Sequence, residues 1–154
     1  MKADAEFERF YETEARAVFS AVFLLCRDRD RAEDATQEAF ARAFARWNRL
    51  GSQPWAAGWV TTTALNVARR GLRRRRPAPE TPQGGNPTDS IDLWASVRTL
   101  PPRQQQVVVL HYRLDLPVKK IAAILGCREG TVRTHLARAR GVLRRGLEGG
   151  SDGN

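Results

Sequence analysis

The sequence has few of the residues from which metal and redox sites are built. It contains two histidines, His111 and His135, and two cysteines, Cys26 and Cys127, which lie about a hundred residues apart. These residues form no Cys-x-x-Cys pair and no group with the spacing of metal ligands. We therefore expect no metal and no cofactor, and we interpret the cysteines as two reduced thiols of a cytosolic protein.

Long hydrophobic runs are also absent. No apolar segment approaches the roughly 20 residues that span a bilayer. The segment Met1–Glu14 is acidic and polar, unlike a signal peptide. The sequence thus predicts a cytoplasmic protein with no membrane contact of its own.

Lysine is scarce, although the chain is strongly basic. Three lysines leave arginine as 23 of the 26 basic residues, and the formal net charge is +9. Residues 1–48 hold eight basic and ten acidic residues, a net charge of −2, whereas the remainder holds 18 basic and seven acidic residues, a net charge of +11. The basic part favours a polyanionic partner such as nucleic acid, and the acidic front favours a separate contact with a protein.

Apolar residues recur at helical spacing, and no long stretch alternates with the period of a strand. The pattern predicts an all-α fold, with helices over residues 7–25, 31–47, 54–75, 91–97 and 102–112 and two more helices after these. Asp28 and Asp30 stand where they would cap the second helix. Pro54 suits the first turn of the third helix.

Residues 77–90, with the sequence PAPETPQGGNPTDS, separate two helical halves. They include four of the eight prolines and almost nothing apolar, so we expect a flexible linker. The predicted organisation is a small helical domain over residues 1–76, the linker over 77–90, a second helical domain over 91–147 and a disordered tail over 148–154.

The segment from Pro117 to Arg145 has the spacing of a helix-turn-helix. Ala122 supplies a small residue where two helices cross, Gly126 suits the tight turn between them, and Val132 faces the first helix from the second. An ordinary αα-hairpin is the alternative. On the second helix Val132 and Leu136 belong to a core stripe, and the opposite face carries arginines separated by small residues, as a helix that approaches base edges requires.

Two tryptophans, Trp55 and Trp59, fall on the polar side of the third helix. The same side carries Asn66, Arg69 and Arg70. An aromatic and basic face of this kind can stack unpaired bases, each contributing about 1–3 kcal/mol. The alternative is that both tryptophans pack under a neighbouring helix.

The chain resembles the extracytoplasmic-function (ECF) sigma factors of bacterial RNA polymerase. Four segments carry the resemblance in the right order: DRAEDATQEAF at residues 30–40; Trp55 with Trp59 and the Asn66–Arg70 stretch; LPPRQQ at 100–105; and IAAILGC with GTVRTHLARAR at 121–140. The resemblance implies two helical domains, sigma region 2 and sigma region 4. It also implies a function in promoter recognition and melting with core polymerase.

The resemblance also implies a role for particular residues. The second helix would dock on the clamp helices of the β′ subunit through Asp34, Gln37 and Glu38, and the second domain would meet the β flap. The loop Leu50–Pro54 would trap a flipped base of the −10 strand. An anti-sigma factor is an expected partner. The −10 contacts are expected from Trp55, Trp59, Thr62, Asn66, Arg69, Arg70 and Arg73, and the −35 contacts from Arg128, Thr131, Arg133, Thr134, Ala137 and Arg138.

Two other classes of function compete with this interpretation. A conventional repressor or activator would explain the charge and the helix-turn-helix, but not the tryptophan-bearing face or the acidic helix before it. A metal-dependent nuclease could use the carboxylates between Asp28 and Glu38. These carboxylates spread around the helix with no histidine or lysine nearby, so we expect no enzyme activity.

Overall fold

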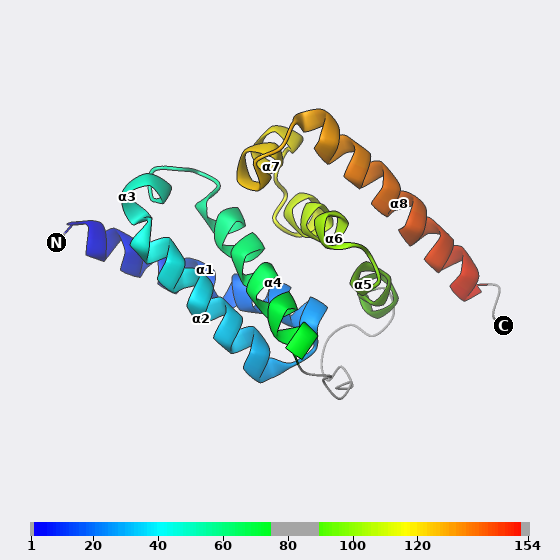
Figure 1. Ribbon diagram of the computed structural model, residues 1–154, viewed down its shortest axis with the longest axis horizontal. Coiled ribbons are helices and arrows are strands. Elements are labelled where there is room, and N and C mark those ends of the chain that lie inside the picture. Colours follow the sequence, from blue (N-terminus) through cyan, green and yellow to red (C-terminus); the bar gives the residue numbers. More distant parts are fainter. Residues whose placement is uncertain (1, 75–89, 152–154) are drawn as a thin grey trace. The chain divides into compact units, whose positions relative to one another are not determined.

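The computed structural model of the chain describes residues 2–74 and 90–151 (Figure 1). These residues form helices and no strand, which confirms the predicted all-α fold. The chain divides into two compact units, Met1–Glu80 and Thr81–Asn154. Of the predicted linker, only Ser90 lies within the described residues, and it begins a helix. The elements are α1 (Lys2–Cys26), α2 (Arg29–Ala45), α3 (Trp47–Leu50) and α4 (Ala56–Arg74), then α5 (Ser90–Arg98), α6 (Pro102–Val108), the π-turn η1 (Val109–Arg113), α7 (Val118–Leu125) and α8 (Glu129–Ser151).

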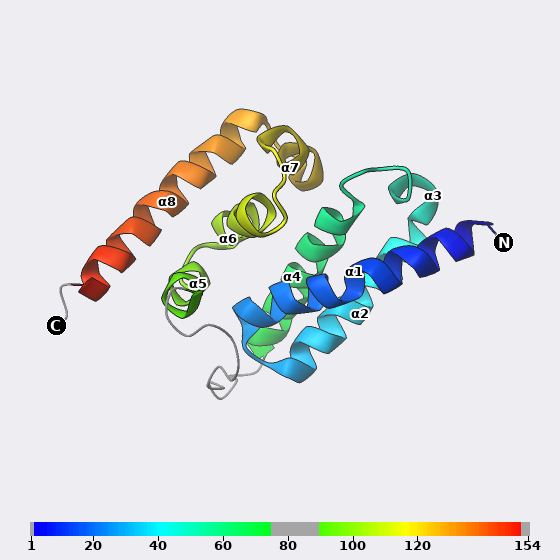
Figure 2. The same ribbon diagram turned by 180° about the vertical axis from the view of Figure 1, so that it is seen from behind.

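The first unit is built on three long helices that all contact one another. Figure 2 shows α1 crossing α2 and α4, and the three pairs are in contact. The buried face of α2 consists largely of alanine, which lets the neighbouring helices approach closely. Asp28 caps α2, as predicted, because its side chain accepts a hydrogen bond from the backbone N–H of Arg31 at 3.1 Å. The core side chains include Val18, Ala21 and Val22 of α1, Ala32, Ala35, Ala39 and Ala43 of α2, and Val60, Ala64, Leu65 and Ala68 of α4.

An aromatic cluster fixes the turn that follows α2. The sequence predicted one helix as far as Trp47, but α2 ends at Ala45 and Trp47 begins the short helix α3. The Trp47 ring lies 5.2 Å from the ring of Phe7 and 4.9 Å from that of Phe10. Burial of the Trp47 indole against α1 therefore stabilises the break in the helix, and sequence periodicity does not register such a tertiary contact.

The second unit is a helix-turn-helix supported by α5 and α6. Gly126 ends α7 in the left-handed conformation, with φ of 68°, and its N–H donates to the carbonyl of Ala122. Val132 is fully buried, as the spacing predicted. Helix α8 packs on α5, α6 and α7. The core of the motif consists of Val107, Leu110, Ile121, Ala122, Leu125, Val132 and Leu136.

Two details of this unit differ from the sequence prediction. The helix expected over residues 102–112 changes at Val109 into the π-turn η1, and the Nδ1 atom of His111 lies 3.1 Å from the carbonyl oxygen of Leu116. Helix α8 continues to Ser151, beyond the boundary predicted at residue 147. No proline interrupts it there, and each further residue of a formed helix adds a hydrogen bond.

Candidate nucleic-acid interfaces

A groove opens in the first unit where α2, α3 and the start of α4 meet. Its volume is about 470 Å³. Both predicted tryptophans line it, and both are half-buried. One side of each indole is thus supported by the protein while the groove stays open to solvent. The lining residues are Ala45, Arg46, Asn48, Arg49, Leu50, Gln53, Trp55 and Trp59.

Arg46 and Arg49 place positive charge in this groove, and neither was predicted from the sequence. The guanidinium carbon of Arg46 lies 5.7 Å from the centre of the Trp59 ring, within the range of a cation–π contact. Arg46 is the residue at the α2–α3 break, and Arg49 lies in α3. The only sequence signal for them was the spacing Arg-Trp-Asn-Arg at residues 46–49. This spacing indicates two groove arginines only if the helix breaks after Ala45, and the periodicity did not predict that break.

Gly51, which follows the groove residue Leu50, approaches the Trp47 indole closely. A Cβ atom at this position would lie 2.6 Å from Cε2 of Trp47, closer than real Cβ atoms come. The backbone N–H of Gly51 donates to the carbonyl of Trp47 at 2.8 Å. Glycine is therefore required here for contact with the indole, rather than for an unusual backbone angle.

The structure separates the remaining predicted −10 residues into different environments. Asn66 and Arg69 are half-buried and Arg70 is exposed. Thr62 is only 7% exposed, and its Oγ1 atom is buried with no hydrogen-bond partner among the described residues. The expectation that Thr62 faces DNA is therefore wrong, because α4 packs on both α1 and α2 and buries a wider arc than one neighbour would. Arg73 lies in α4, but its side chain is outside the described part of the chain.

Asp34, Gln37 and Glu38 are all exposed and form a ridge on α2. Gln37 borders a groove shared with α1, and Asp34 borders one shared with α4. Glu38 accepts a hydrogen bond from Arg42 at 2.6 Å. Phe44 is 52% exposed and continues the same helical stripe.

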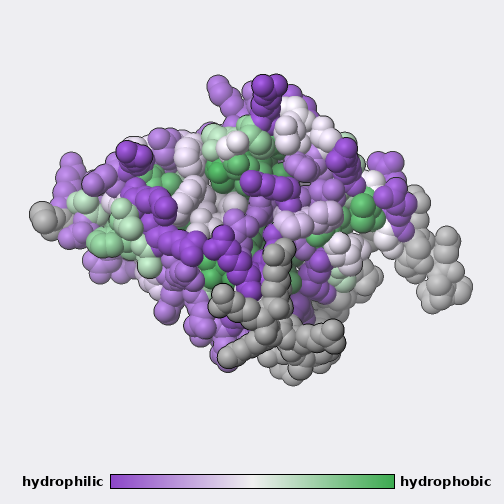
Figure 3. All heavy atoms as spheres, viewed as in Figure 1, coloured by the Kyte–Doolittle hydropathy of each residue, from purple (hydrophilic) through white to green (hydrophobic). Residues whose placement is uncertain are grey.

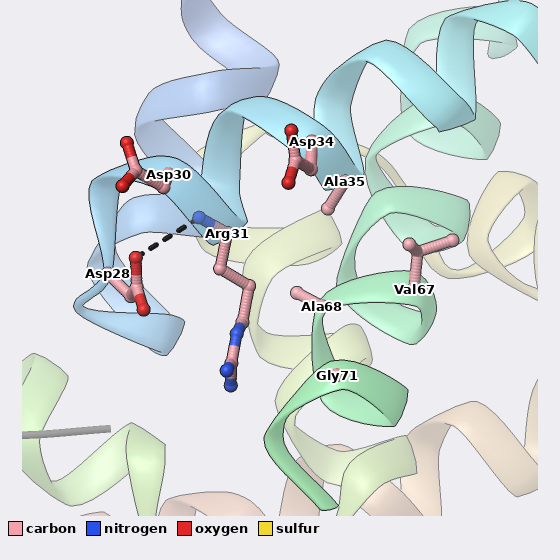
Figure 4. Close-up of a pocket in the computed structure, with 8 residues that line it drawn as sticks. All are labelled: Asp28, Asp30, Arg31, Asp34, Ala35, Val67, Ala68 and Gly71. Carbon is pink, nitrogen blue, oxygen red and sulfur yellow. Dashed lines mark hydrogen bonds between the residues drawn. The ribbon is translucent and has the colours of Figure 1, made fainter. Parts of the chain in front are cut away.

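The groove beside Asp34 has a volume of about 410 Å³ and is acidic at its α2 side (Figure 4). The Arg31 side chain extends from α2 to run beside Gly71 of α4. Asp28 and Asp30 lie at the start of α2 near it. Within the described residues, no group of carboxylates, histidines and cysteines is arranged to hold a metal ion.

The outer face of α8, together with Arg128 just before it, carries the predicted −35 residues. Figure 3 shows purple hydrophilic side chains interspersed with white and green ones over this face of the molecule. Arg133 lies 3.7 Å from Glu129 in an exposed ion pair, a contact weak enough to exchange for another partner. Arg128, Thr131, Arg133, Thr134, Ala137 and Arg138 are all exposed, whereas Val132, Leu136, Ala139 and Leu143 are buried on the opposite side.

His135 belongs to the inner side of this helix. It is half-buried, and its Nδ1 atom is buried with no hydrogen-bond partner among the described residues. Burial lowers the pKa of His135, and the positive charges of Arg138 and Arg103 lower it further. This nitrogen is therefore not available to a phosphate group.

Residues 10–78 match the sigma-70 region 2 family, and residues 90–143 match the sigma-70 region 4 family. The chain is 29% identical to an RNA polymerase sigma-E factor of Streptomyces avermitilis, over 93% of this chain and 86% of that protein. It is 30% identical to the ECF RNA polymerase sigma factor SigC of Mycobacterium tuberculosis, over 73% of this chain and 68% of that one.

The fold is shared with a solved sigma factor. RpoE of Bartonella quintana, solved in complex with the anti-sigma factor NepR, superimposes with a TM-score of 0.72 at 22% identity, covering 92% of this chain and 96% of that one. In the part of the chain that is described, no helix is long and apolar enough to cross a membrane. The family consists of non-catalytic transcription initiation factors. The match to region 2 excludes a conventional repressor, and the chain belongs to the sigma-70 family as an RNA polymerase sigma factor of the ECF type.

Proposed function

We propose that the groove between α3 and α4 captures an unstacked base of the −10 non-template strand. The observation that carries this proposal is the pair of half-buried indoles, Trp55 and Trp59, in one groove with two arginines. Stacking on an indole contributes about 1–3 kcal/mol per base. That is comparable to the few kcal/mol needed to unstack a base from a duplex, so strand capture can drive local melting.

The second unit reads the −35 duplex with the start of α8. Its exposed face presents Arg133 and Arg138 on either side of the small residue Ala137. Arginine pairs with the O6 and N7 atoms of guanine in a bidentate manner, and a small neighbour lets the helix enter the major groove closely. Arg144 and Arg145 lie farther along the helix and are placed for contact with phosphate.

The α2 ridge is the docking surface for core polymerase, on the clamp helices of the β′ subunit. Asp34, Gln37 and Glu38 supply its polar part, and Phe44 adds an exposed aromatic side chain of the kind enriched at protein interfaces. The region 4 unit meets the β flap. An anti-sigma factor would inactivate the protein by covering these faces. The protein works in the cytoplasm, where polymerase and chromosome are, and it catalyses no reaction itself.

Reconstituted run-off transcription tests strand capture. Core polymerase and the full chain are assayed on a genomic promoter library, and the selected promoter is then used with Trp59→Ala and Trp59→Phe. We expect Trp59→Ala to reduce open-complex formation about 5- to 150-fold, which corresponds to the loss of one stacking contact, and Trp59→Phe to retain most activity. A premelted template should rescue Trp59→Ala in part. If both variants act like the wild type, the groove does not hold a base.

A further inference from the structure

The Arg46 side chain covers the Trp59 ring, on which the proposed base would stack. Arg46 stands in the break between α2 and α3, where its backbone N–H donates to Ala43 rather than continuing the helix. Its side chain is exposed, and its guanidinium carbon lies 5.7 Å from the centre of the Trp59 ring. Both residues line the same groove, so the arginine covers the ring from the side that is open to DNA.

A base and the Arg46 guanidinium cannot share this side of the indole. A stacked base lies at van der Waals distance from the ring, about 3.5–4.0 Å. With the guanidinium at 5.7 Å, roughly 2 Å would remain between base and arginine, which is well below a contact distance. Entry of a base therefore requires Arg46 to leave the ring.

When Arg46 leaves the ring, its positive charge can pair with a phosphate group of the incoming strand. Its side chain is long and exposed, and each nucleotide that enters brings a phosphate group. We propose that Arg46 is a gate for the groove: it covers Trp59 in the free protein and moves to a strand phosphate when a base stacks on the ring. This inference rests on the proposed strand capture and adds a control step to it.

Arg49 provides the matched control for this gate. It lines the same groove and is likewise exposed, and the described residues show no ring contact for it. Loss of Arg49 removes a charge without uncovering an indole. The variants Arg46→Gln and Arg49→Gln therefore differ in one respect, the release of the Trp59 ring.

The first measurement is binding of the full chain to a fluorescein-labelled 12-nucleotide single strand of mixed sequence, from 0.05 to 0.5 M salt. Loss of one phosphate contact lowers the slope of log affinity against log salt by about 0.7. The ratio of Arg46→Gln to wild-type affinity should thus rise about fivefold across this range. At 0.5 M salt the variant should bind about two- to fivefold more tightly than the wild type, because a cation–π contact no longer competes.

Arg49→Gln should bind more weakly than the wild type at low salt and should never exceed it. If Arg46→Gln also stays below the wild type at every salt concentration, the arginine does not compete with the base and the gate is wrong. If the wild type itself does not bind the strand, the proposed strand capture fails instead.

A second measurement examines the gate without DNA. The indole N–H signals of the tryptophans are recorded by NMR, and the Trp59 signal is assigned with Trp59→Phe. Arg46→Gln should shift the Trp59 signal, and Arg49→Gln should leave it in place. An unchanged Trp59 signal in Arg46→Gln would overturn the gate whatever the DNA result.

Discussion

Substitution of Gly51 by alanine should destabilise the first unit, although alanine normally stabilises a position of this kind. Gly51 has φ of −64° and ψ of −23°, which alanine adopts readily. At such a site, Gly→Ala stabilises by about 0.4–1 kcal/mol through the unfolded chain. Any destabilisation must therefore come from the contact that the new methyl group makes.

That contact is severe. The added Cβ would lie 2.6, 2.9 and 3.0 Å from three atoms of the Trp47 indole. The indole is buried, and it is also in contact with the rings of Phe7 and Phe10. Overpacking of this type costs about 1–3 kcal/mol, so the net loss should lie between about 0 and about 2.6 kcal/mol, centred at about 1.3 kcal/mol, after the gain in the unfolded state.

Thermal unfolding measures this effect. Trp47, Trp55 and Trp59 all belong to the first unit, so tryptophan fluorescence in a Trp94→Phe background follows that unit alone. The midpoint should fall by roughly 4–8 °C for each kcal/mol lost. Gly130→Ala is the control, because a Cβ at that position meets nothing within 4 Å, and followed by far-UV circular dichroism it should be neutral or stabilising. An equal or higher midpoint for Gly51→Ala would show that the Trp47 indole moves aside freely and that the close contact is not costly.

Three further predictions concern docking, pH and duplex reading. Glu38→Lys should weaken binding to core polymerase, measured by native gel shift, but leave binding to the −35 duplex unchanged. The control Arg42→Ala, which frees the Glu38 carboxylate from its 2.6 Å hydrogen bond, should not weaken binding to core polymerase. Equal loss of polymerase and duplex binding in Glu38→Lys would count against the docking ridge. Because the pKa of His135 is lowered in the folded state, the unfolded chain binds the proton more readily, so the free energy of unfolding should decrease as pH falls below about 6.5. His135→Gln should lessen that decrease in urea titrations, and an identical pH dependence would contradict it. Arg138→Ala should lose about 10- to 100-fold in affinity for a −35 duplex and relax the base preference at one position; a uniform loss across sequences would indicate a phosphate contact instead.

The sequence predicted well which side chains of α8 are buried and which are exposed, because this pattern is a property of one regular helix. Val132 and Leu136 on the buried side and Arg133 and Ala137 on the exposed side follow directly from the period of 3.6 residues. Gly126 was also predictable, since a left-handed residue at a helix end favours glycine.

The groove was only partly predictable because it depends on tertiary contacts. The two tryptophans were predicted from the sequence but the arginines beside them were not, since the α2–α3 break arises from the packing of Trp47 on α1. Thr62 was misplaced for a related reason. The width of the buried arc on α4 depends on how many helices cover it, and a single helical wheel does not contain that number.

These two kinds of site suit the two tasks of an ECF sigma factor. Duplex DNA presents a regular surface, so a straight helix with one exposed face can read it. An unstacked base needs a concave site with supported aromatic walls, and such a site requires an interruption of the helices, here the break at Arg46 between α2 and α3. Because both sites belong to one chain, duplex binding at the second unit raises the effective concentration of the groove near the −10 strand. Weak capture of a single base is then sufficient. The proposed gate would lower the affinity of the groove for stray single strands, and this loss of affinity would matter little at a promoter, where the second unit already holds the DNA.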